Sequence, residues 1–261
     1  MMGPMDAAND VVGRVAALLR AVAAHEPGGA STTLLGRDVG LARATCHRLL
    51  SSLADHGLLD REPASGRWRL GPETYLFGLA VAARYDVTEI ARPTVQRLAR
   101  LTGESAFFSV RRGDETVCLI REDGSFPIRS HVLYEGIRFP LGVASAGLAI
   151  LAFLAERDRE DFLGRTDLTV QYGQNHRADD LRRRVSSTHT TGYAVNPGLI
   201  VPDSWGLAAA VFDVAGRPQW ALSLTGIASR FAPPRQQELG QLLLREAHEL
   251  TRQPGERQGA R

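Results

Sequence analysis

Residues 31–70 read STTLLGRDVGLARATCHRLLSSLADHGLLDREPASGRWRL, and this stretch decides how the N-terminal part of the chain folds. It contains a short apolar segment, a glycine at position 40 and a second segment with leucines at helical spacing. The leucines on the inner face of that second segment are Leu49, Leu50 and Leu53. A short helix, a tight turn at Gly40 and a second helix form the pattern of a helix-turn-helix.

The outer face of the second predicted helix is polar. Its side chains are of the types that hydrogen-bond to base edges and phosphates in a major groove of DNA. Arg43 lies nearest the helix N-terminus, where a bidentate contact to guanine can form. The residues predicted to contact DNA from this helix are Arg43, Thr45, His47, Arg48 and Ser51. Two alternatives remain open: a solvated helix without a ligand, and a winged helix that contacts only protein.

A β-hairpin is predicted directly after this helix. Residues 58–60 and 67–70 are short strand-like segments on either side of the turn at 63–66. Such a hairpin is the wing of a winged helix, and a first helix over residues 11–25 packs on the helix pair. The arginines of the wing that can lie along a phosphate backbone are Arg61, Arg67 and Arg69, of which Arg67 and Arg69 are the predicted phosphate contacts.

Length and composition limit the possible classes of protein. A chain of 261 residues is expected to form two domains, and a hydrophobic share of 44 % supports a buried core rather than disorder. The net charge is only +2. Any DNA contact must therefore come from the local placement of charge, because no global basic field attracts nucleic acid.

The cysteine content and the apolar stretches indicate a cytoplasmic protein. Cys46 and Cys118 are too few for a metal-ligand set and are typical of a reduced cytosolic chain. Residues 1–10 lack the basic and apolar regions of a signal peptide. The longest apolar stretch, about 142–154, is too short and too rich in Gly and Ala to span a bilayer. We therefore expect no metal, no other cofactor and no membrane partner.

The remainder of the chain is predicted to form a linker and a second domain. The expected boundaries are 1–71 for the winged helix-turn-helix domain, 72–87 for a linker helix centred on 73–85, 88–252 for the second domain and 253–261 for a flexible tail. The expected strands of the second domain are 106–110, 116–120, 126–133, 192–195, 207–213 and 219–225. Its expected helices are 88–101, 144–154, 158–163, 179–190 and 233–250. This order predicts an α+β domain with helices beside a mostly antiparallel sheet.

Several short motifs occur in a characteristic order along the chain. They are GLARATCHRLL at 40–50, GRWRLG at 66–71, RFPL at 138–141 with ASAG at 144–147, Gly192-Tyr193, AAAVFD at 208–213, and SLTG at 223–226 with Ser229-Arg230. Together and in this order they resemble the IclR-type bacterial transcriptional regulators, over about residues 11–250.

The resemblance implies a winged helix joined by a linker helix to a GAF-like effector-binding domain. It also implies a homodimer or a dimer of dimers that binds operator DNA and senses a small metabolite, often an organic acid. The helix-turn-helix pattern independently favours a pair of recognition helices on a palindrome, because one recognition helix reads too few base pairs to be specific in a genome.

The predicted effector pocket surrounds residues 141–147, which open a helix after a strand. Free backbone N–H groups and the helix dipole at such an end favour a carboxylate. The residues that match the family's backbone donors are Ser145 and Ala146, and the matching strand positions are Asn196, Gly206, Ser223 and Thr225. The two strand hydroxyls alternate onto one face, as a pocket wall requires. Alternatively, these small and hydroxyl residues serve only helix–sheet packing.

Two departures from the family pattern change the expected ligand. The family often has an acidic run after the Gly-Tyr pair, whereas Asn196-Pro-Gly198 stands here and offers no carboxylate to a polar effector. A cysteine is common just before the strand at 207–213, but this chain has Gly206. The residues expected to make the pocket more apolar are Leu133, Phe139 and Trp205, which favours an aromatic or larger acid over one of two or three carbons.

An enzyme is the main alternative of another class. The sequence GVASAG at 142–147 resembles a nucleophile elbow, but its spacing is one residue too long. The chain contains no lysine, hence no P-loop, and it has no dinucleotide fingerprint. His131, His176 and His189 have no carboxylate partner at a recognisable spacing. We therefore expect no catalytic residues, with a hydrolase-like enzyme as the alternative.

Overall fold

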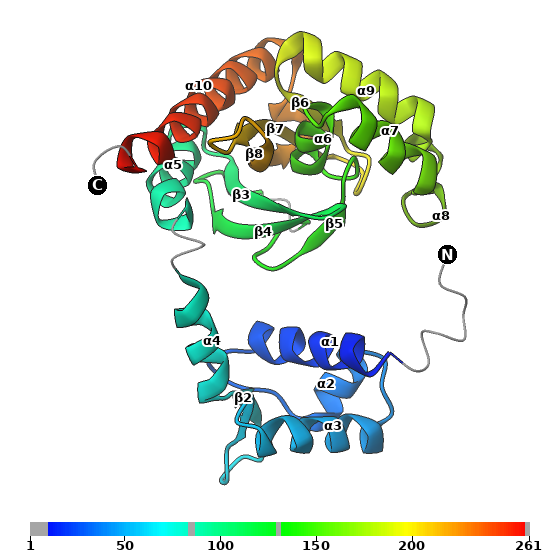
Figure 1. Cartoon of the computed structure of the whole chain (residues 1–261), viewed down its shortest axis with the longest axis vertical. Coiled ribbons are helices and arrows are strands. Elements are labelled where there is room, and N and C mark those ends of the chain that lie inside the picture. The colour runs from blue at the N-terminus through cyan, green and yellow to red at the C-terminus, as the bar shows by residue number, and fades with distance from the viewer. Residues whose placement is uncertain (1–9, 83–86, 129–131, 259–261) are drawn as a thin grey trace. The chain divides into compact units, whose positions relative to one another are not determined.

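Three helices and a small hairpin make up most of the N-terminal unit, residues 1–85 (Figure 1). They are α1 (Val11–Ala24), α2 (Thr32–Asp38), α3 (Arg43–Asp55), β1 (Leu59–Arg61) and β2 (Trp68–Leu70). These elements form the predicted winged helix-turn-helix. The structure is a computed structural model that describes residues 10–82, 87–128 and 132–258. Residues 1–9, which make up most of the segment predicted to carry no export signal, lie outside the described residues.

The N-terminal unit is held together by a small apolar core. Its fully buried members are Leu18, Val22, Leu35, Leu50, Leu59 and Trp68. The turn between α2 and α3 is tight, since Leu41 N donates to Gly36 O over 2.8 Å and Gly40 has a φ of 67°, a conformation that favours glycine. Trp68 joins the hairpin to α2, because its Nε1 donates to Thr32 Oγ1 over 2.9 Å.

The helix α4 (Pro72–Ala82) follows the hairpin at the predicted linker position. The end of the predicted linker helix, residues 83–86, lies outside the described residues. Four large apolar side chains of α4 are more than half exposed: Tyr75, Leu76, Phe77 and Leu79. A helix with so much exposed apolar surface is expected to be covered in the functional assembly.

A six-stranded antiparallel sheet forms the centre of the second unit, residues 86–261. Its strands are β3 (Ser105–Arg112), β4 (Glu115–Glu122), β5 (Arg138–Pro140), β6 (Ala194–Pro197), β7 (Ser204–Phe212) and β8 (Pro218–Ile227). Their order in the sheet is β5-β4-β3-β8-β7-β6. The last strand of the chain therefore lies at the middle, where β8 pairs with both β3 and β7.

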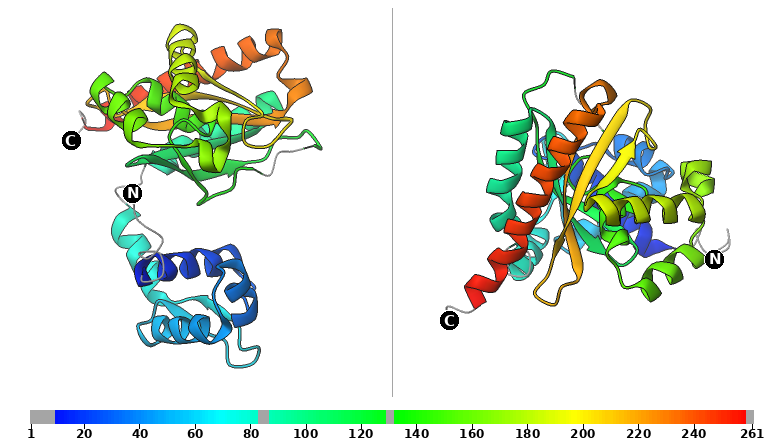
Figure 2. Two further views of the ribbon diagram at one scale, coloured as in Figure 1. Left: turned by 90° about the vertical axis from the view of Figure 1, so that its right-hand side faces the viewer. Right: turned by 90° about the horizontal axis from the view of Figure 1, so that it is seen from above.

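Helices cover both faces of this sheet, as Figure 2 shows from two directions. The helices are α5 (Val87–Thr102), α6 (Ser145–Ala152), α7 (Glu156–Arg165), α8 (Thr169–Tyr172), α9 (Ala178–Thr191) and α10 (Pro233–Gln258). Alternation along the strands separates two cores: Phe107 and Ala208 face α6, α7 and α9, whereas Phe108 and Leu207 face α5 and α10. The predicted α+β class is confirmed.

Two predicted segments of this unit are wrong. The strand expected at 126–133 is a loop in its described parts, 126–128 and 132–133, while residues 129–131 lie outside the described residues. Its apolar residues are anchored one at a time: Arg230 stacks on Phe126, with 4.1 Å between the guanidinium carbon and the ring centroid, and Leu133 enters the core. Pro127 also removes a ladder donor. The edge strand is instead β5, beside β4.

The C-terminal helix is longer than predicted. The flexible tail was expected from residue 253, but α10 continues to Gln258. The apolar spacing stops at Leu250, and the residues that follow, TRQPGERQ, combine good helix formers with Pro254 and Gly255, the two poorest. Loss of apolar periodicity therefore marked the end of packing rather than the end of the helix. Within the described part of the chain, no helix combines the length and apolarity needed to cross a membrane.

Candidate nucleic-acid interface and ligand pocket

The helix α3 presents its predicted polar face to solvent. Arg43 is the first residue of the helix, and Arg43, His47 and Arg48 are exposed, while Thr45 and Ser51 are half-buried. Neither Arg43 nor Arg48 forms an ion pair or hydrogen bond within the described residues. Both guanidinium groups are therefore available to bases and phosphates. The opposite face is buried through Cys46, Leu50 and Leu53.

The arginines of the wing are differently placed, because each already has a partner within the N-terminal unit. Arg67 Nη1 donates to Gly28 O over 3.3 Å and to Gly29 O over 3.2 Å. Arg69 pairs with Glu62 at 3.5 Å. Arg61 stacks on the Trp68 ring, with 5.4 Å between the guanidinium carbon and the ring centroid. These contacts hold the hairpin in shape, so any phosphate must share or displace them.

Trp68 also links the wing to the recognition helix. The His47 ring lies edge-on to the Trp68 ring, with 6.1 Å between centroids. Trp68 is almost fully buried and therefore fixes the position of the wing relative to α3. The sequence marked His47 as a DNA contact but gave no indication of this neighbour.

A narrow pocket opens at the N-terminus of α6, as predicted. It has a volume of about 300 Å³ including its open mouth, and a free interior of about 20 Å³. Its lining residues are Val132, Leu133, Ala144, Ser145, Asn196, Ile200, Ser204, Trp205, Gly206 and Thr225. Five of the eight predicted effector residues are therefore brought together: Ser145, Asn196, Trp205, Gly206 and Thr225.

The backbone at the start of α6 supplies hydrogen-bond donors. The first helical bond runs from Leu148 N to Ala144 O at 2.9 Å, so the N–H groups of Ser145, Ala146 and Gly147 have no acceptor within the helix. Ala144 is the N-cap and makes no side-chain capping bond. All eight residues of α6 are buried. Buried N–H groups at a helix N-terminus favour an anion.

Asn196 builds the pocket wall through two hydrogen bonds to the backbone. Its Nδ2 donates to Val143 O over 2.7 Å, and its Oδ1 accepts from Leu199 N over 2.9 Å. The amide thus joins the turn before α6 to the turn after β6. One Nδ2 hydrogen remains for another acceptor.

Two hydroxyl groups of β8 are buried without a hydrogen-bond partner among the residues that the structure describes. Ser223 Oγ and Thr225 Oγ1 lie on the face of the sheet toward α6, and only Thr225 lines the pocket. Polar atoms without partners are uncommon in protein interiors and require an explanation. Gly206 stands opposite on β7, where an added Cβ would lie 2.9 Å from Ser145 Oγ. The glycine therefore leaves space that any side chain would fill.

Three of the predicted effector residues do not line the pocket. Phe139 belongs to β5 and packs in the core near Tyr172, with 6.4 Å between ring centroids. Ala146 and Ser223 are buried beside the pocket rather than in its wall. Conversely, sequence reasoning missed Val132, Ala144, Ile200 and Ser204 as lining residues. All four lie in or next to loops or turns, whose residues have no periodicity to reveal them.

Two family models match the chain over both units. Residues 11–63 match the IclR helix-turn-helix domain, and residues 79–252 match the C-terminal domain of the bacterial transcriptional regulator IclR. The chain belongs to the IclR family. The relatives that the chain matches are named as transcriptional regulators or repressors, so this family member is a DNA-binding transcriptional regulator and not an enzyme.

Individual relatives cover most of this IclR-family chain. The regulator KipR of Bacillus subtilis is 27 % identical over 217 residues, which span 83 % of this chain and 86 % of KipR. The regulator BhcR of Paracoccus denitrificans is 28 % identical over 229 residues, which span 85 % of this chain and 80 % of BhcR. An IclR homologue from Microbacterium hydrocarbonoxydans, solved as a complex with 4-hydroxybenzoate, shares the fold, with a TM-score of 0.71, 24 % identity and coverage of 92 % and 97 % of the two chains.

Proposed function

We propose that this IclR-family regulator is a cytoplasmic, metabolite-gated operator reader. It binds palindromic double-stranded DNA as a homodimer or a dimer of dimers, through α3 and the wing. A small organic acid, aromatic rather than of two or three carbons, modulates that binding from the pocket at α6. The observation that carries the effector assignment is the buried, uncapped N-terminus of α6 opening into the same pocket as Asn196 and Thr225.

The chemistry of the pocket supports a carboxylate with an apolar body. The N–H groups at the start of α6 suit the carboxylate, and the unpartnered Thr225 hydroxyl suits a polar group elsewhere on the ligand. The apolar wall consists of Val132, Leu133, Ile200 and Trp205. The bound 4-hydroxybenzoate of the Microbacterium homologue has this combination of groups and occurs on the same fold.

An aromatic ligand requires the pocket to widen. A cavity of about 150 Å³ is the size that admits benzene, whereas the free interior here is about 20 Å³. Ile200 and Ser204 are half-buried lining residues, the residues 201–203 between them are exposed, and this segment forms the outer wall. We expect this wall to move outward when the ligand enters, so that binding selects or induces a second conformation.

Dimerisation through α4 connects the effector to DNA. The exposed apolar side chains of α4, Tyr75 to Leu79, are suited to pairing with the same helix of a second copy. A change in the packing of effector domains alters the spacing of two α3 helices through this pair. An effector achieves this only if it binds one spacing more tightly than the other.

The DNA-binding face is tested with arginine variants. Arg43→Ala and Arg48→Ala should weaken binding to the DNA upstream of the gene, measured by fluorescence anisotropy at several salt concentrations. Each lost phosphate contact lowers the salt slope by about one, and loss of a bidentate base contact costs about 1–3 kcal/mol. Arg100→Ala, an exposed arginine of α5, is the matched control. Unchanged affinity in both α3 variants would contradict the proposed interface.

The effector site is tested by removing one backbone donor. Ser145 is the first residue of α6, where proline is tolerated, and Ala144 before it has the extended conformation that precedes proline. Ser145→Pro deletes the N–H and the hydroxyl, whereas Ser145→Ala deletes only the hydroxyl. With 4-hydroxybenzoate as the probe in calorimetric titration, Ser145→Pro should bind about 10–100-fold more weakly than Ser145→Ala, since a hydrogen bond to a charged group contributes about 1.5–3 kcal/mol.

Two results would contradict the effector proposal. One is equal affinity of the proline and alanine variants when circular dichroism shows both to be folded. The other is equal 4-hydroxybenzoate affinity of the wild-type protein with and without operator DNA, because a ligand that does not discriminate between the two states cannot gate DNA binding.

A further inference from the structure

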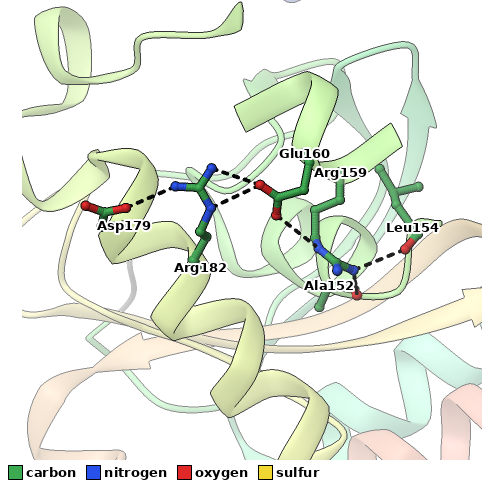
Figure 3. Close-up of polar contacts among 6 residues, drawn as sticks. All are labelled: Ala152, Leu154, Arg159, Glu160, Asp179 and Arg182. Carbon is green, nitrogen blue, oxygen red and sulfur yellow. Dashed lines mark hydrogen bonds and ion pairs between the residues drawn. The ribbon is translucent and has the colours of Figure 1, made fainter. Parts of the chain in front are cut away.

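The helix α7 makes a polar contact with the end of α6 that lies away from the pocket. Arg159 Nη1 donates to Ala152 O and to Leu154 O, each over 3.3 Å (Figure 3). Ala152 is the last residue of α6 and Leu154 lies two residues beyond it, so one guanidinium group binds the last carbonyl of the helix and one in the chain that follows. The Arg159 side chain is 17 % exposed.

This contact is important because α6 is entirely buried. The last carbonyl groups of a helix have no intrahelical donor and normally turn to water or to a capping group. Water has little access here, and a cation at this end also complements the negative pole of the helix dipole. Arg159 therefore fixes the C-terminal end of the helix whose N-terminal end opens into the pocket.

The neighbouring residue of α7 reaches the other helix of this layer. Glu160 Oε2 accepts from Arg182 Nε and Nη2 of α9 over 3.1 and 2.8 Å, and Arg182 also donates to Asp179 over 3.0 Å (Figure 3). These side chains are nearly half exposed, so the ion pair contributes little energy by itself. The contact of Arg159 with α6 is the better shielded from water of the two, because the Arg159 side chain is less exposed.

Both helices held by α7 lead to the pocket wall. The helix α6 begins at Ser145, and α9 runs through Gly192 into β6, which carries Asn196. Asn196 and Val143 then join the two at the pocket itself. We propose that Arg159, with Glu160 as the weaker partner, is a positioning residue that sets the effector affinity of the pocket from the opposite end of α6. This inference rests on the proposed effector site.

The test compares Arg159→Gln with Arg157→Gln, an exposed arginine on the same helix. With 4-hydroxybenzoate as the probe, the dissociation constant of Arg159→Gln should rise about tenfold, a typical size for coupling between sites. Arg159→Lys should recover part of the affinity, because lysine also caps helix C-termini. Glu160→Gln should change the affinity less than Arg159→Gln does. The affinity is measured well below the unfolding transition, where a loss of stability alone does not alter it.

A second measurement tests the same inference without a ligand. Backbone hydrogen exchange of residues 148–150, the first amides of α6 with a helical hydrogen bond, should be faster in Arg159→Gln than in Arg157→Gln, while binding to DNA remains unchanged. If the wild-type protein does not bind 4-hydroxybenzoate, the choice of effector is wrong and the exchange result decides the role of Arg159. The proposal is overturned if exchange at residues 148–150 is equal in the two variants, or if the wild-type protein binds 4-hydroxybenzoate and Arg159→Gln binds it with the same affinity.

Discussion

Replacement of Asn196 by alanine should destabilise the second unit by about 2–4 kcal/mol. The Asn196 side chain is buried and joins Val143 O to Leu199 N with hydrogen bonds of 2.7 and 2.9 Å. Alanine leaves both backbone groups without a partner, and each orphaned group costs about 1–3 kcal/mol. Leu199 is only half-buried, so water recovers part of the loss on that side.

Replacement of the same residue by aspartate gives a pH-dependent result. A carboxylate at this position accepts from Leu199 N but places a second oxygen against Val143 O, where only the protonated acid can donate. The pKa of the new carboxyl is therefore raised in the folded state above its unfolded value of about 3.9. The stabilisation from the hydrogen bond that the protonated acid donates to Val143 O is fully present below the unfolded pKa. It is lost as the pH rises through the pKa of the folded state. Asn196→Asp should approach wild-type stability at low pH and fall below it near neutral pH.

Urea unfolding followed by tryptophan fluorescence measures both effects. Trp205 pairs with Pro197, the residue next to Asn196, and reports on this region. Asn175→Ala, an exposed asparagine near α9, is the matched control and should change stability by less than about 0.5 kcal/mol. The reasoning is refuted if Asn196→Ala is as stable as that control, or if the difference between Asn196→Asp and wild type does not change with pH.

Three further predictions concern single residues. Burial is the main cause that lowers the pKa of His176 in the folded protein, and the charge of Arg184 lowers it further. As the pH falls, the imidazole is therefore protonated in the unfolded chain before it is protonated in the folded one. The free energy of unfolding should consequently fall as the pH drops through about 6.5, the ordinary pKa of histidine. In His176→Gln, the urea midpoint should depend less on pH over that range. Burial raises the pKa of Cys118 to about 12, so a disulfide reagent at pH 8 should label this thiol in urea but not in the native protein. Arg67→Ala should lower both the unfolding free energy of the N-terminal unit, by about 1 kcal/mol, and the salt slope of DNA binding, by about one.

The parts predicted well from the sequence are those determined by local patterns. The helix-turn-helix was predictable because a leucine face, Gly40 and the Pro63–Gly66 turn are each encoded within a few residues. The strands β3 and β4 alternate clearly and share a short glycine turn, which identified the hairpin. The segment at 126–133 has similar apolar spacing, but separate distant contacts hold its residues, so the same spacing was misleading.

The parts that could not be predicted depend on contacts between distant segments. The carbonyls that bind Arg67 lie 38 and 39 residues earlier in the chain, and a phosphate contact was the natural interpretation of an exposed arginine. The pocket residues Val132 and Ile200 come from loops without periodicity, and the pairing of β8 with β7 places Thr225 opposite Gly206 in the same pocket. The helix start at Ser145 was found because a strand, a turn and small residues occur consecutively.

The lining of the pocket also limits the charge of the proposed effector. None of the described lining residues is ionisable, so a buried negative charge is stabilised only by neutral donors, namely backbone N–H groups, hydroxyls and the remaining Asn196 Nδ2 hydrogen, together with the helix dipole. These donors suit one carboxylate. A dicarboxylate would bring a second charge against Val132, Leu133 or Ile200, where burial without a partner is costly. A neutral ring would leave the donors of α6 unpaired. The same physical constraints that favour a carboxylate therefore favour a monoacid, whose remaining polar group is uncharged and within reach of Thr225.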